Sequence, residues 1–464
     1  MKTVGSISIS HNLVTKLGID VQPSIFVRVG SLKVKSKLII RDNSEKGYIL
    51  SPELIRALRI KKRKGMKIRY QTEEKMLHLG PTIGILATFI PGPNREELDP
   101  RSLQAELIYL SIISKTFPGQ IYLFTPGSIN WANQTCRGYV YKQFSQYRGR
   151  WESSIYPLPD VVYDRIHSRT AEARNNVQYA KNRLMKLPYL HYFNPHYFNK
   201  WNVHQILLTN PLLINYLPET LELDNHNLQK MLQKYRVLYM KPSNGSLGKG
   251  IIKVSASKGK LKYVAYRSRR IHNQASSPAE LMRKTKKLRD DRHYIVQQGL
   301  NLAKYKGSPF DLRIIYQKNG RGEWLISKKF CRIAPRGSSI SNLSSGGRVE
   351  KSSKVLRYLF KTEDLIKSKN EQIRLLCKLV ASTLETVSNS TFGELGLDIG
   401  IDQKGHLYLI EVNSKPRKTT DTVFSMNIVR NTFKRPLAYA TYLAGFKVNT
   451  VSSTKKRKQR TRRR

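Results

Sequence analysis

Apolar and polar positions alternate with period two along residues 396–416, GLDIGIDQKGHLYLIEVNSKP. Such alternation is typical of a β-hairpin that buries one face. The apolar positions that define this face are Leu397, Ile399, Ile401, Tyr408, Ile410 and Val412. The pattern therefore predicts a hairpin whose loop is residues 403–406.

The opposite face of this hairpin carries carboxylate and amide side chains. With that loop, Asp398 lies directly across from Glu411, and Asn413 shares their face. Two facing carboxylates repel each other unless a cation lies between them. Carboxylate and amide oxygens suit Mg²⁺, which completes its coordination shell with nucleotide phosphates. We therefore predict a metal site at these three residues, with an exposed polar face as the alternative.

The hydrophobic pattern upstream of the hairpin changes between the periods of helices and strands. Residues 370–387 place apolar side chains at helical spacing, which predicts an amphipathic helix packed on the hairpin. Strand-like runs occupy residues 82–90, 120–126 and 161–166, and helical patterns occupy residues 103–115 and 169–186. Strands that alternate with helices predict a parallel α/β layer.

The first 80 residues contain an internal repeat. The segment from Ser10 to Ile19 returns as the segment from Ser51 to Ile60, with leucines at matching positions. Each copy predicts a strand, a short helix and a further strand, so the two copies could close into a small β-barrel. This unit resembles a double-psi barrel.

These patterns divide the 464 residues into three units and a tail. We expect a small β-rich domain at residues 1–80, an α/β domain at 81–189, a larger domain that carries the chemistry at 190–446, and a disordered basic tail at 447–464. The last ten residues, KKRKQRTRRR, hold much of this basic charge.

The charge balance is strongly positive, with 83 Lys and Arg against 32 Asp and Glu and a net charge of +51. Such a chain attracts polyanions, so polyanionic partners are expected for the tail. The three cysteines lack metal-ligand or paired spacing, and no run of 18 apolar residues occurs. We therefore expect a protein without a membrane span, in a reducing cytoplasmic compartment.

A glycine-rich segment at residues 237–254, VLYMKPSNGSLGKGIIKV, follows an apolar strand that ends at Lys241. Small residues let backbone N–H groups approach phosphate oxygens closely. The candidate phosphate-contacting residues are Lys241, Ser243, Gly245, Ser246, Gly248 and Gly250. The spacing does not match a Walker A motif, and a plain glycine-rich hairpin turn is the alternative.

The hairpin and the glycine-rich segment together resemble the ATP-grasp superfamily, in which two lobes clamp Mg-ATP. The resemblance implies a further phosphate-contacting lysine at Lys200 and adenine contacts at Gln297 and Gln298, in the segment YIVQQ. It also implies catalytic roles for Arg313, in the motif FDLR, and Asn342, in the motif SNLSSGG. The implied metal ligands are Asp398, Glu411 and Asn413, and the implied cofactors are ATP and Mg²⁺, with Mn²⁺ as a substitute.

Within that superfamily, the order of motifs after Pro81 resembles the YheC/YheD group, which is described as endospore coat-associated. The resemblance implies an ATP-grasp fold at residues 190–446, preceded by a pre-ATP-grasp α/β domain. One departure is the stretch PRGSSIS before Asn342, which lacks acidic residues that could bind an amino group. The basic tail is a second feature that the motifs do not explain.

Three functions remain open at this point. The resemblance favours an ATP-dependent carboxylate–amine ligase that acts through an acyl phosphate on an unknown acid and an unknown amine. The alternative is a catalytically silent, nucleotide-binding component of the spore coat. Nucleic-acid binding through charge ranks last, because the sequence shows no zinc finger, helix-turn-helix or RNP motif.

Overall fold

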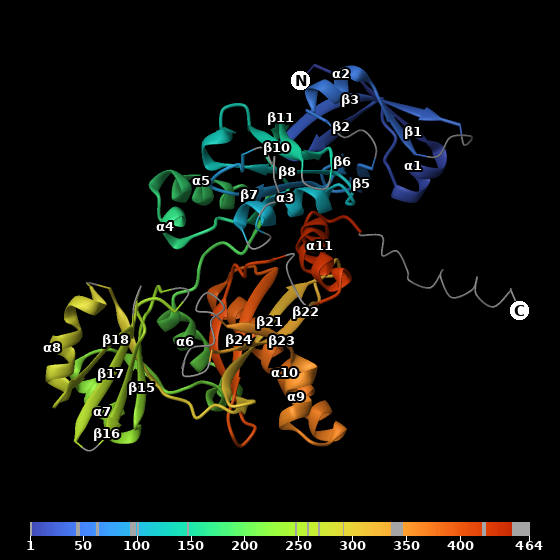
Figure 1. The fold of residues 1–464 in the computed structure, drawn as a ribbon. Helices are drawn as coiled ribbons and strands as arrows, with labels where there is room; N and C mark the ends of the chain where they lie inside the picture. Colours follow the sequence, from blue (N-terminus) through green and yellow to red (C-terminus); the bar gives the residue numbers. More distant parts are fainter. Residues whose placement is uncertain are drawn as a thin grey trace, which may run out of the picture.

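The computed structural model describes residues 2–42, 47–61, 65–92, 99, 102–145, 148–245, 248–257, 259–267, 270–290, 292–335, 347–419 and 424–447. These residues form four β-sheets in sequence order, with helices packed on them (Figure 1). This confirms the predicted mixed α/β class. Ser246, Asn342 and residues 448–464 lie outside the described residues, so the predictions for them and for the basic tail stay predictions.

The first sheet contains both copies of the internal repeat, in the strand order β4-β1-β3-β2-β6-β5. Its elements are β1 (Ser6–Ser10), α1 (His11–Leu17), β2 (Ser24–Val29), β3 (Leu32–Arg41), β4 (Tyr48–Leu50), α2 (Pro52–Ala57), β5 (Lys67–Gln71) and β6 (Met76–Gly80). Antiparallel pairs β2–β3 and β5–β6 occupy equivalent places in the two copies, and β2 joins β6 in parallel. The copies therefore combine in one barrel-like unit, although no described pairing joins β4 to β5.

The second sheet has the order β11-β10-β8-β7-β12-β13. Its strands are β7 (Thr82–Leu86), β8 (Gln120–Phe124), β9 (Ile129–Asn130), β10 (Thr135–Gln143), β11 (Gly149–Pro157), β12 (Val161–Asp164) and β13 (His191–Phe193). The contacts β7–β8, β7–β12 and β12–β13 are parallel, as predicted, whereas β10 and β11 extend the sheet in antiparallel fashion. The helices of this region are α3 (Leu103–Ser114), α4 (Arg169–Glu172) and α5 (Asn175–Met185).

The third sheet is antiparallel throughout, in the order β14-β19-β15-β16-β17-β18. Its strands are β14 (Thr220–Glu222), β15 (Val237–Pro242), β16 (Ile252–Ser257), β17 (Lys260–Tyr266), β18 (Arg270–Ala275) and β19 (Tyr294–Gln298). Helices α7 (Asn225–Lys234) and α8 (Pro278–Arg289) contribute apolar side chains to its core. In the sequence, α6 (Lys200–Leu208) and the 3-10 helix η2 (Pro211–Tyr216) precede the first strand of this sheet. Figure 1 shows α6 between the third and fourth sheets.

The fourth sheet, in the order β23-β22-β21-β24-β25, is also antiparallel. Its strands are β20 (Lys304–Tyr305), β21 (Ser308–Lys318), β22 (Trp324–Ile333), β23 (Arg348–Lys351), β24 (Glu394–Ile401) and β25 (Leu407–Asn413). Helices α9 (Ser352–Leu359) and α10 (Glu363–Ser388) pack with it in one core, which includes Cys377. The predicted hairpin and the helix on it are therefore confirmed.

One part of the hairpin prediction is wrong. The register pairs Asp398 with Glu411 but Ile399 with Leu409, so Ile410 is an extra residue in β25. This bulge reverses the alternation, because one added residue turns the following side chains to the other face. Leu407 and Leu409 therefore enter the core in place of Tyr408 and Ile410.

The last helix, α11 (Met426–Leu443), belongs by sequence to the predicted third domain but packs elsewhere as well. Its residues Val429, Phe433 and Leu437 lie in a core with β7, β12 and α3 of the second sheet. In Figure 1 this helix lies between the second and fourth sheets. The domain boundaries stay a prediction, and α11 joins two of the predicted units.

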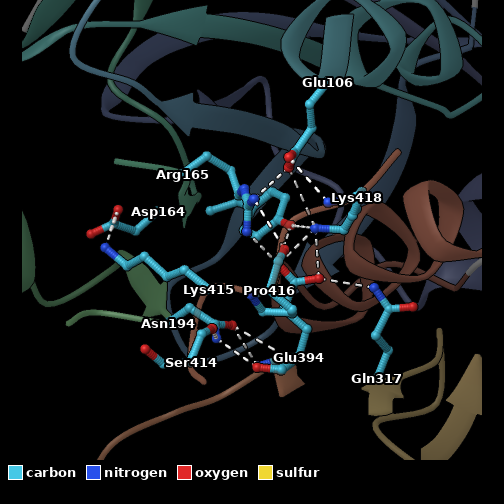
Figure 2. A network of polar contacts seen from close by, with 12 residues as sticks. Glu106, Asp164, Arg165, Asn194, Gln317, Glu394, Ser414, Lys415, Pro416 and Lys418 are labelled. Carbon is cyan, nitrogen blue, oxygen red and sulfur yellow. Dashed lines mark hydrogen bonds and ion pairs between the residues drawn. The ribbon is translucent and has the colours of Figure 1, made fainter. Parts of the chain in front are cut away.

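A buried ring of charges lies between the second and fourth sheets (Figure 2). Its members are Glu106, Arg165, Glu394 and Lys418, none with a side chain more than 4% exposed. Arg165 donates hydrogen bonds to both glutamates, and its Nη1 lies 2.8 Å from Glu394. Lys418 Nζ lies 2.8 Å from Glu394 and 3.8 Å from Glu106. Two cations and two carboxylates thus balance each other, so each buried charge has opposite charges beside it.

A second ring of the same kind adjoins the first. Its members are Asp164, Glu172, Lys181 and Lys415. Lys415 Nζ lies 2.7 Å from each of the two carboxylates, while Lys181 Nζ lies 2.7 Å from Glu172 and 3.2 Å from Asp164. The two lysines hold the pKa of Glu172 at about 2, although burial raises it.

Both rings are completed by the segment that follows the hairpin. Residues 414–418 supply Lys415 to one ring and Lys418 to the other, while Asp164 and Arg165 come from the end of β12. Asn194 adds hydrogen bonds to the backbone oxygens of Glu394 and Ser414. The hairpin is therefore attached to the carboxyl edge of the second sheet by buried ion pairs.

We expect Glu394→Gln to destabilise this junction selectively. The amide leaves Arg165 and Lys418 sharing one carboxylate, and breaking a buried ion pair from one side costs about 3–5 kcal/mol. Hydrogen exchange should show a lower opening free energy for peptides of β12 and β24, and no change for β16 and β17 in the third sheet.

Glu371→Gln is the matched control for this variant, because Glu371 lies exposed on α10. A surface change of this kind should alter stability by no more than about 0.5 kcal/mol. Equal exchange in the two variants would show that the ring does not hold the sheets together.

Candidate functional site

The predicted metal face lies on β24 and β25, at one edge of the fourth sheet. Asp398 on β24 pairs directly with Glu411 on β25, and Gly396 pairs with Asn413. Asp398 is only 3% exposed. A Cβ on Gly396 would lie 3.0 Å from Pro416 Cβ and 3.7 Å from Arg313 Cζ, so the face is closely packed beside Asn413.

The two carboxylates are not left facing each other. Arg313 Nη1 lies 2.5 Å from one oxygen of Asp398, and Arg332 Nη2 lies 2.9 Å from the other. Arg332 Nε also lies 2.6 Å from Asp311. Two arginines from neighbouring strands thus neutralise Asp398, so relief of the repulsion does not require a metal ion. Within the FDLR motif, Asp311 therefore pairs with Arg332 and Arg313 pairs with Asp398.

Glu411 faces a group of cations. Lys200 Nζ lies 3.0 Å from its carboxylate. Burial raises the pKa of Glu411, but the charges of Lys200, Arg313 and Lys241 lower it by more. The pKa of this carboxyl group therefore lies below its ordinary value, and the group is ionised at neutral pH. The residues that the sequence assigned to phosphate and metal thus lie around one carboxylate.

Lys200 is held in place from both ends. It is the first residue of α6, where Asn199 caps the helix by accepting hydrogen bonds from Trp201 N and Asn202 N. Its backbone N–H donates to Ser243 O over 2.9 Å, and its Nζ donates to Gly245 O over 2.6 Å. The start of α6 is therefore attached to the glycine-rich segment of the third sheet.

The glycine-rich segment begins as a turn at the end of β15. Ser243 is buried, and its hydroxyl lies 2.7 Å from Nδ1 of His293. Gly245 N–H donates to Pro242 O, while Gly248 and Gly250 have φ angles of +73° and +81°. Positive φ at these two positions favours glycine, because other residues adopt it at a steric cost. The described residues on either side of positions 246–247 thus have turn-like backbone, which both interpretations of the sequence allow.

Lys241 and Gln297 lie side by side where β15 pairs with β19. Lys241 Nζ donates to Gln297 Oε1 over 2.5 Å, and Gln297 Nε2 donates to Thr220 Oγ1. Burial lowers the pKa of Lys241 to about 8, with Glu411 raising it and Lys200 lowering it further. Gln298 points to the sheet edge, where its Oε1 accepts a hydrogen bond from Glu219 N.

A small pocket, partly open to solvent, lies between the third sheet and β25. Its polar lining includes Lys200, His204, Thr220, Lys241, Gln297 and Glu411, and its apolar lining includes Leu217, Ile295, Leu409 and Ile410. Burial lowers the pKa of His204 to about 4, so this imidazole is neutral at pH 7. Apolar walls with a few polar groups at one end are typical of sites for small organic ligands.

The donor set of the metal face suits a hard divalent cation only in part. Glu411 and Asn413 offer carboxylate and amide oxygens of the kind that Mg²⁺ prefers. Asp398 could join them only by giving up a contact with Arg313 or Arg332. Across the described part of the chain, no three or more His, Cys, Asp or Glu side chains are grouped closely enough to hold a metal ion.

Several residues of this site were not anticipated from the sequence. Arg332 was missed because its partners Asp311 and Asp398 are distant in sequence, and only the pairing of β21 with β22 and β24 brings them together. His204 has no metal-ligand spacing or motif in the sequence, but its place one turn after Lys200 on α6 puts both on the pocket side.

Comparison with known proteins places this site in a family. The sequence model of YheC/D-like ATP-grasp proteins matches residues 189–443. The endospore coat-associated protein YheD of Bacillus subtilis (strain 168) is 29% identical over 427 residues, which cover 89% of this chain and 90% of that protein. The endospore coat-associated protein YheC of the same strain is 24% identical over 355 residues, covering 74% of this chain and 94% of that protein.

Among solved structures, D-alanyl-alanine synthetase A from Vibrio cholerae O1 biovar eltor str. N16961 aligns with 79% of this chain and 99% of its own. The sequence identity is 15% and the TM-score is 0.44, so this similarity is reported without further weight. None of the described helices is both long and apolar enough to cross a membrane. Because the family model spans more than half of the sequence, the chain belongs to the YheC/D-like ATP-grasp family.

Proposed function

We propose that this protein binds Mg-ATP between its third and fourth sheets and uses it to activate a carboxylate for ligation to an amine. The observation that carries the proposal is the convergence of cations on Glu411. Lys200, Lys241 and Arg313 come from a helix and two different sheets, and all three lower the pKa of this carboxylate. Cations gathered around a single acidic ligand suit a polyphosphate and its metal ion.

Each residue has a role in this proposal. The apolar walls and Gln297 bind the adenine, while Lys200, Lys241 and the glycine-rich segment bind the phosphates. Glu411 and Asn413 are the metal ligands, with Asp398 available if an arginine releases it. The bound metal ion would neutralise charge on the phosphate oxygens.

The reaction has two steps. An oxygen of the substrate carboxylate attacks the γ-phosphorus of ATP, the bond to the β,γ-bridging oxygen breaks, and an acyl phosphate and ADP form. The lone pair of an amine then attacks the acyl carbon, phosphate leaves with the bonding electrons, and the amine loses a proton to give an amide.

Arg313, the residue assigned as catalytic, would release Asp398 to face the transferred phosphoryl group. No side-chain nucleophile takes part, so positioning and charge supply the catalysis. Asn342, also assigned as catalytic, lies outside the described residues.

A silent nucleotide-binding component of the spore coat is the second candidate. The two relatives are named as endospore coat-associated proteins, and the basic tail offers a means of attachment to polyanionic coat material. Such a component would bind Mg-ATP but release no ADP. Measuring ADP release over a panel of acids and amines therefore separates the two candidates.

We expect Glu411→Gln to impair Mg-ATP binding and turnover. In the parent, Mg-ATP at 100 times its dissociation constant should stabilise the fold by about 2.7 kcal/mol. The variant loses the anionic metal ligand, so this stabilisation should fall, and any ADP release that depends on added acid should fall about a hundredfold. Calorimetric melting with and without Mg-ATP provides the first measurement, and a coupled ADP assay provides the second.

Glu371→Gln, on the exposed face of α10, is the control that makes the same charge change away from the site. It should keep the full nucleotide effect. If Mg-ATP stabilised Glu411→Gln as much as the parent, Glu411 would not be a metal ligand. If Mg-ATP did not stabilise the parent at all, the proposed nucleotide binding would be excluded.

We also expect nucleotide affinity to depend on the protonation of Lys241. Its pKa of about 8 in the free protein means that the ammonium is present below pH 8 and is lost above it. Bound phosphate favours the charged form, so affinity should be full below pH 8 and should fall about tenfold between pH 7 and pH 9. Lys241→Arg stays charged over this range, and its affinity should remain level. Titration calorimetry with a non-hydrolysable ATP analogue measures both profiles, and parallel profiles would show that Lys241 does not contact phosphate.

A further inference from the structure

The carboxyl edge of the second sheet faces the metal hairpin. In this sheet β7 lies between β8 and β12. From β7 the chain passes to β8 on one side, and it later enters β12 on the other side. In open parallel sheets, ligands bind outside the carboxyl ends of strands at such a switch point. The rings around Lys415 and Lys418 attach the hairpin at this same edge.

Arg169 is a cation at this edge that has no charged partner among the described residues. It begins α4, five residues after the end of β12, and its guanidinium lies over the Tyr197 ring at 5.2 Å. Its Nε is buried, and in the described part of the chain nothing accepts a hydrogen bond from it or forms an ion pair with the guanidinium. Burial lowers the pKa of Arg169, while the charges of Glu411, Tyr197 and Glu172 raise it.

Tyr197 fixes the position of this arginine relative to the proposed phosphate site. Its hydroxyl donates to Ile166 O over 2.9 Å, and its backbone N–H donates to Glu172 over 2.9 Å. Lys415 Nζ also lies 5.0 Å from the ring. Lys200 follows only three residues later, so one short segment carries both the stacking ring and a proposed phosphate contact.

The charges around Arg169 favour binding of an anion over binding of an ammonium group. The nearby carboxylates Asp164 and Glu172 are each bound by two lysines, and Glu106 and Glu394 are bound by Arg165 and Lys418. His167, at the same edge, lies 2.6 Å from Thr88 Oγ1, and burial lowers the pKa of this imidazole. An incoming amine would therefore find no unpaired carboxylate at this edge among the described residues, whereas an incoming anion finds a guanidinium.

We propose that the substrate activated by this protein carries a second carboxylate, and that Arg169 binds this second group while the first faces the γ-phosphate of ATP. This inference rests on the proposed function, because it concerns the acid that the bound nucleotide would activate. A guanidinium with two free N–H directions can bind a carboxylate through two parallel hydrogen bonds. The stacked Tyr197 ring keeps the fork in one orientation before the substrate arrives. Arg169 thus selects dicarboxylic acids over monocarboxylic acids.

Titration calorimetry on the full chain tests this assignment. The probes are succinate, glutarate and adipate, each compared with butyrate at matched ionic strength, in the presence of Mg²⁺ and a non-hydrolysable ATP analogue. The parent should bind at least one dicarboxylate more tightly than butyrate. Arg169→Gln should weaken that binding about tenfold or more, since a hydrogen-bonded charge is lost, while binding of the analogue stays within about twofold. Arg169→Lys should give an intermediate affinity, because the charge remains and the fork is lost.

Arg137→Gln is the matched control. Arg137 lies exposed on β10 of the same sheet, beside Thr125 and Asn130 rather than the metal hairpin, and its loss makes the same change in net charge. It should leave dicarboxylate binding unchanged, which separates a specific contact from the general attraction of a basic surface. Equal weakening in Arg137→Gln and Arg169→Gln would overturn the assignment, as would a parent that binds butyrate as tightly as every dicarboxylate.

The two proposals can fail separately in this experiment. If the parent does not bind the ATP analogue, the proposed function fails. The dicarboxylate titrations repeated without nucleotide still compare Arg169→Gln with Arg137→Gln, and a loss confined to the former supports the anion site by itself. Normal analogue binding with no dicarboxylate preference would leave the nucleotide site intact and overturn the role of Arg169.

Discussion

Two buried, alternately charged rings hold the metal hairpin against the second sheet, and the geometry of the site depends on them. Each ring contains two cations and two carboxylates, so burial costs are offset only while all four members are present. Lys415 and Lys418 lie within five residues after Asn413 in sequence. Any shift of the hairpin away from the second sheet would therefore separate buried charges. The rings thus fix the position of Glu411, on the hairpin, relative to Arg169, at the edge of the second sheet.

The ion pairs of the site itself differ from those rings in a way that suits ligand binding. Lys200 and Glu411 are 17% and 28% exposed, whereas Lys418 and Glu394 are 1% and 0% exposed. A partly exposed pair gains little free energy from its contact, so a ligand can replace it at small cost. The chain thus combines contacts that hold the sheets with contacts that phosphate and metal could exchange. The pair of Arg313 and Asp398, which are 18% and 5% exposed, lies between these two extremes.

Local patterns in the sequence predicted the elements of this structure well, because each depends on neighbouring residues. The hairpin, the helix that packs on it and the parallel strands of the second sheet follow from periodicity. The grouping of Lys200 and Lys241 near Glu411 is what the family resemblance implied. The extra residue Ile410 did not follow, since a bulge adds a residue to one strand without leaving a break in an apolar run. The partners of Asp398 and the two rings also did not follow, because they join residues from different elements of the chain that no local pattern connects. A lysine such as Lys418 also looks the same in sequence whether it is buried or exposed.

Charge balance links these observations to the chemistry. Within the rings each charge is matched, so they exert little net field on the cleft between them and the third sheet. Around Glu411 the balance is different, because Asp311, Asp398 and Glu411 face Lys200, Lys241, Arg169, Arg313 and Arg332. An excess of cations that are partly withdrawn from water is costly unless an anion joins them, as the lowered pKa of Lys241 shows. The fold therefore holds a cationic cluster in place at some cost in stability, and a bound polyanion that carries a divalent cation would offset this cost by restoring neutrality.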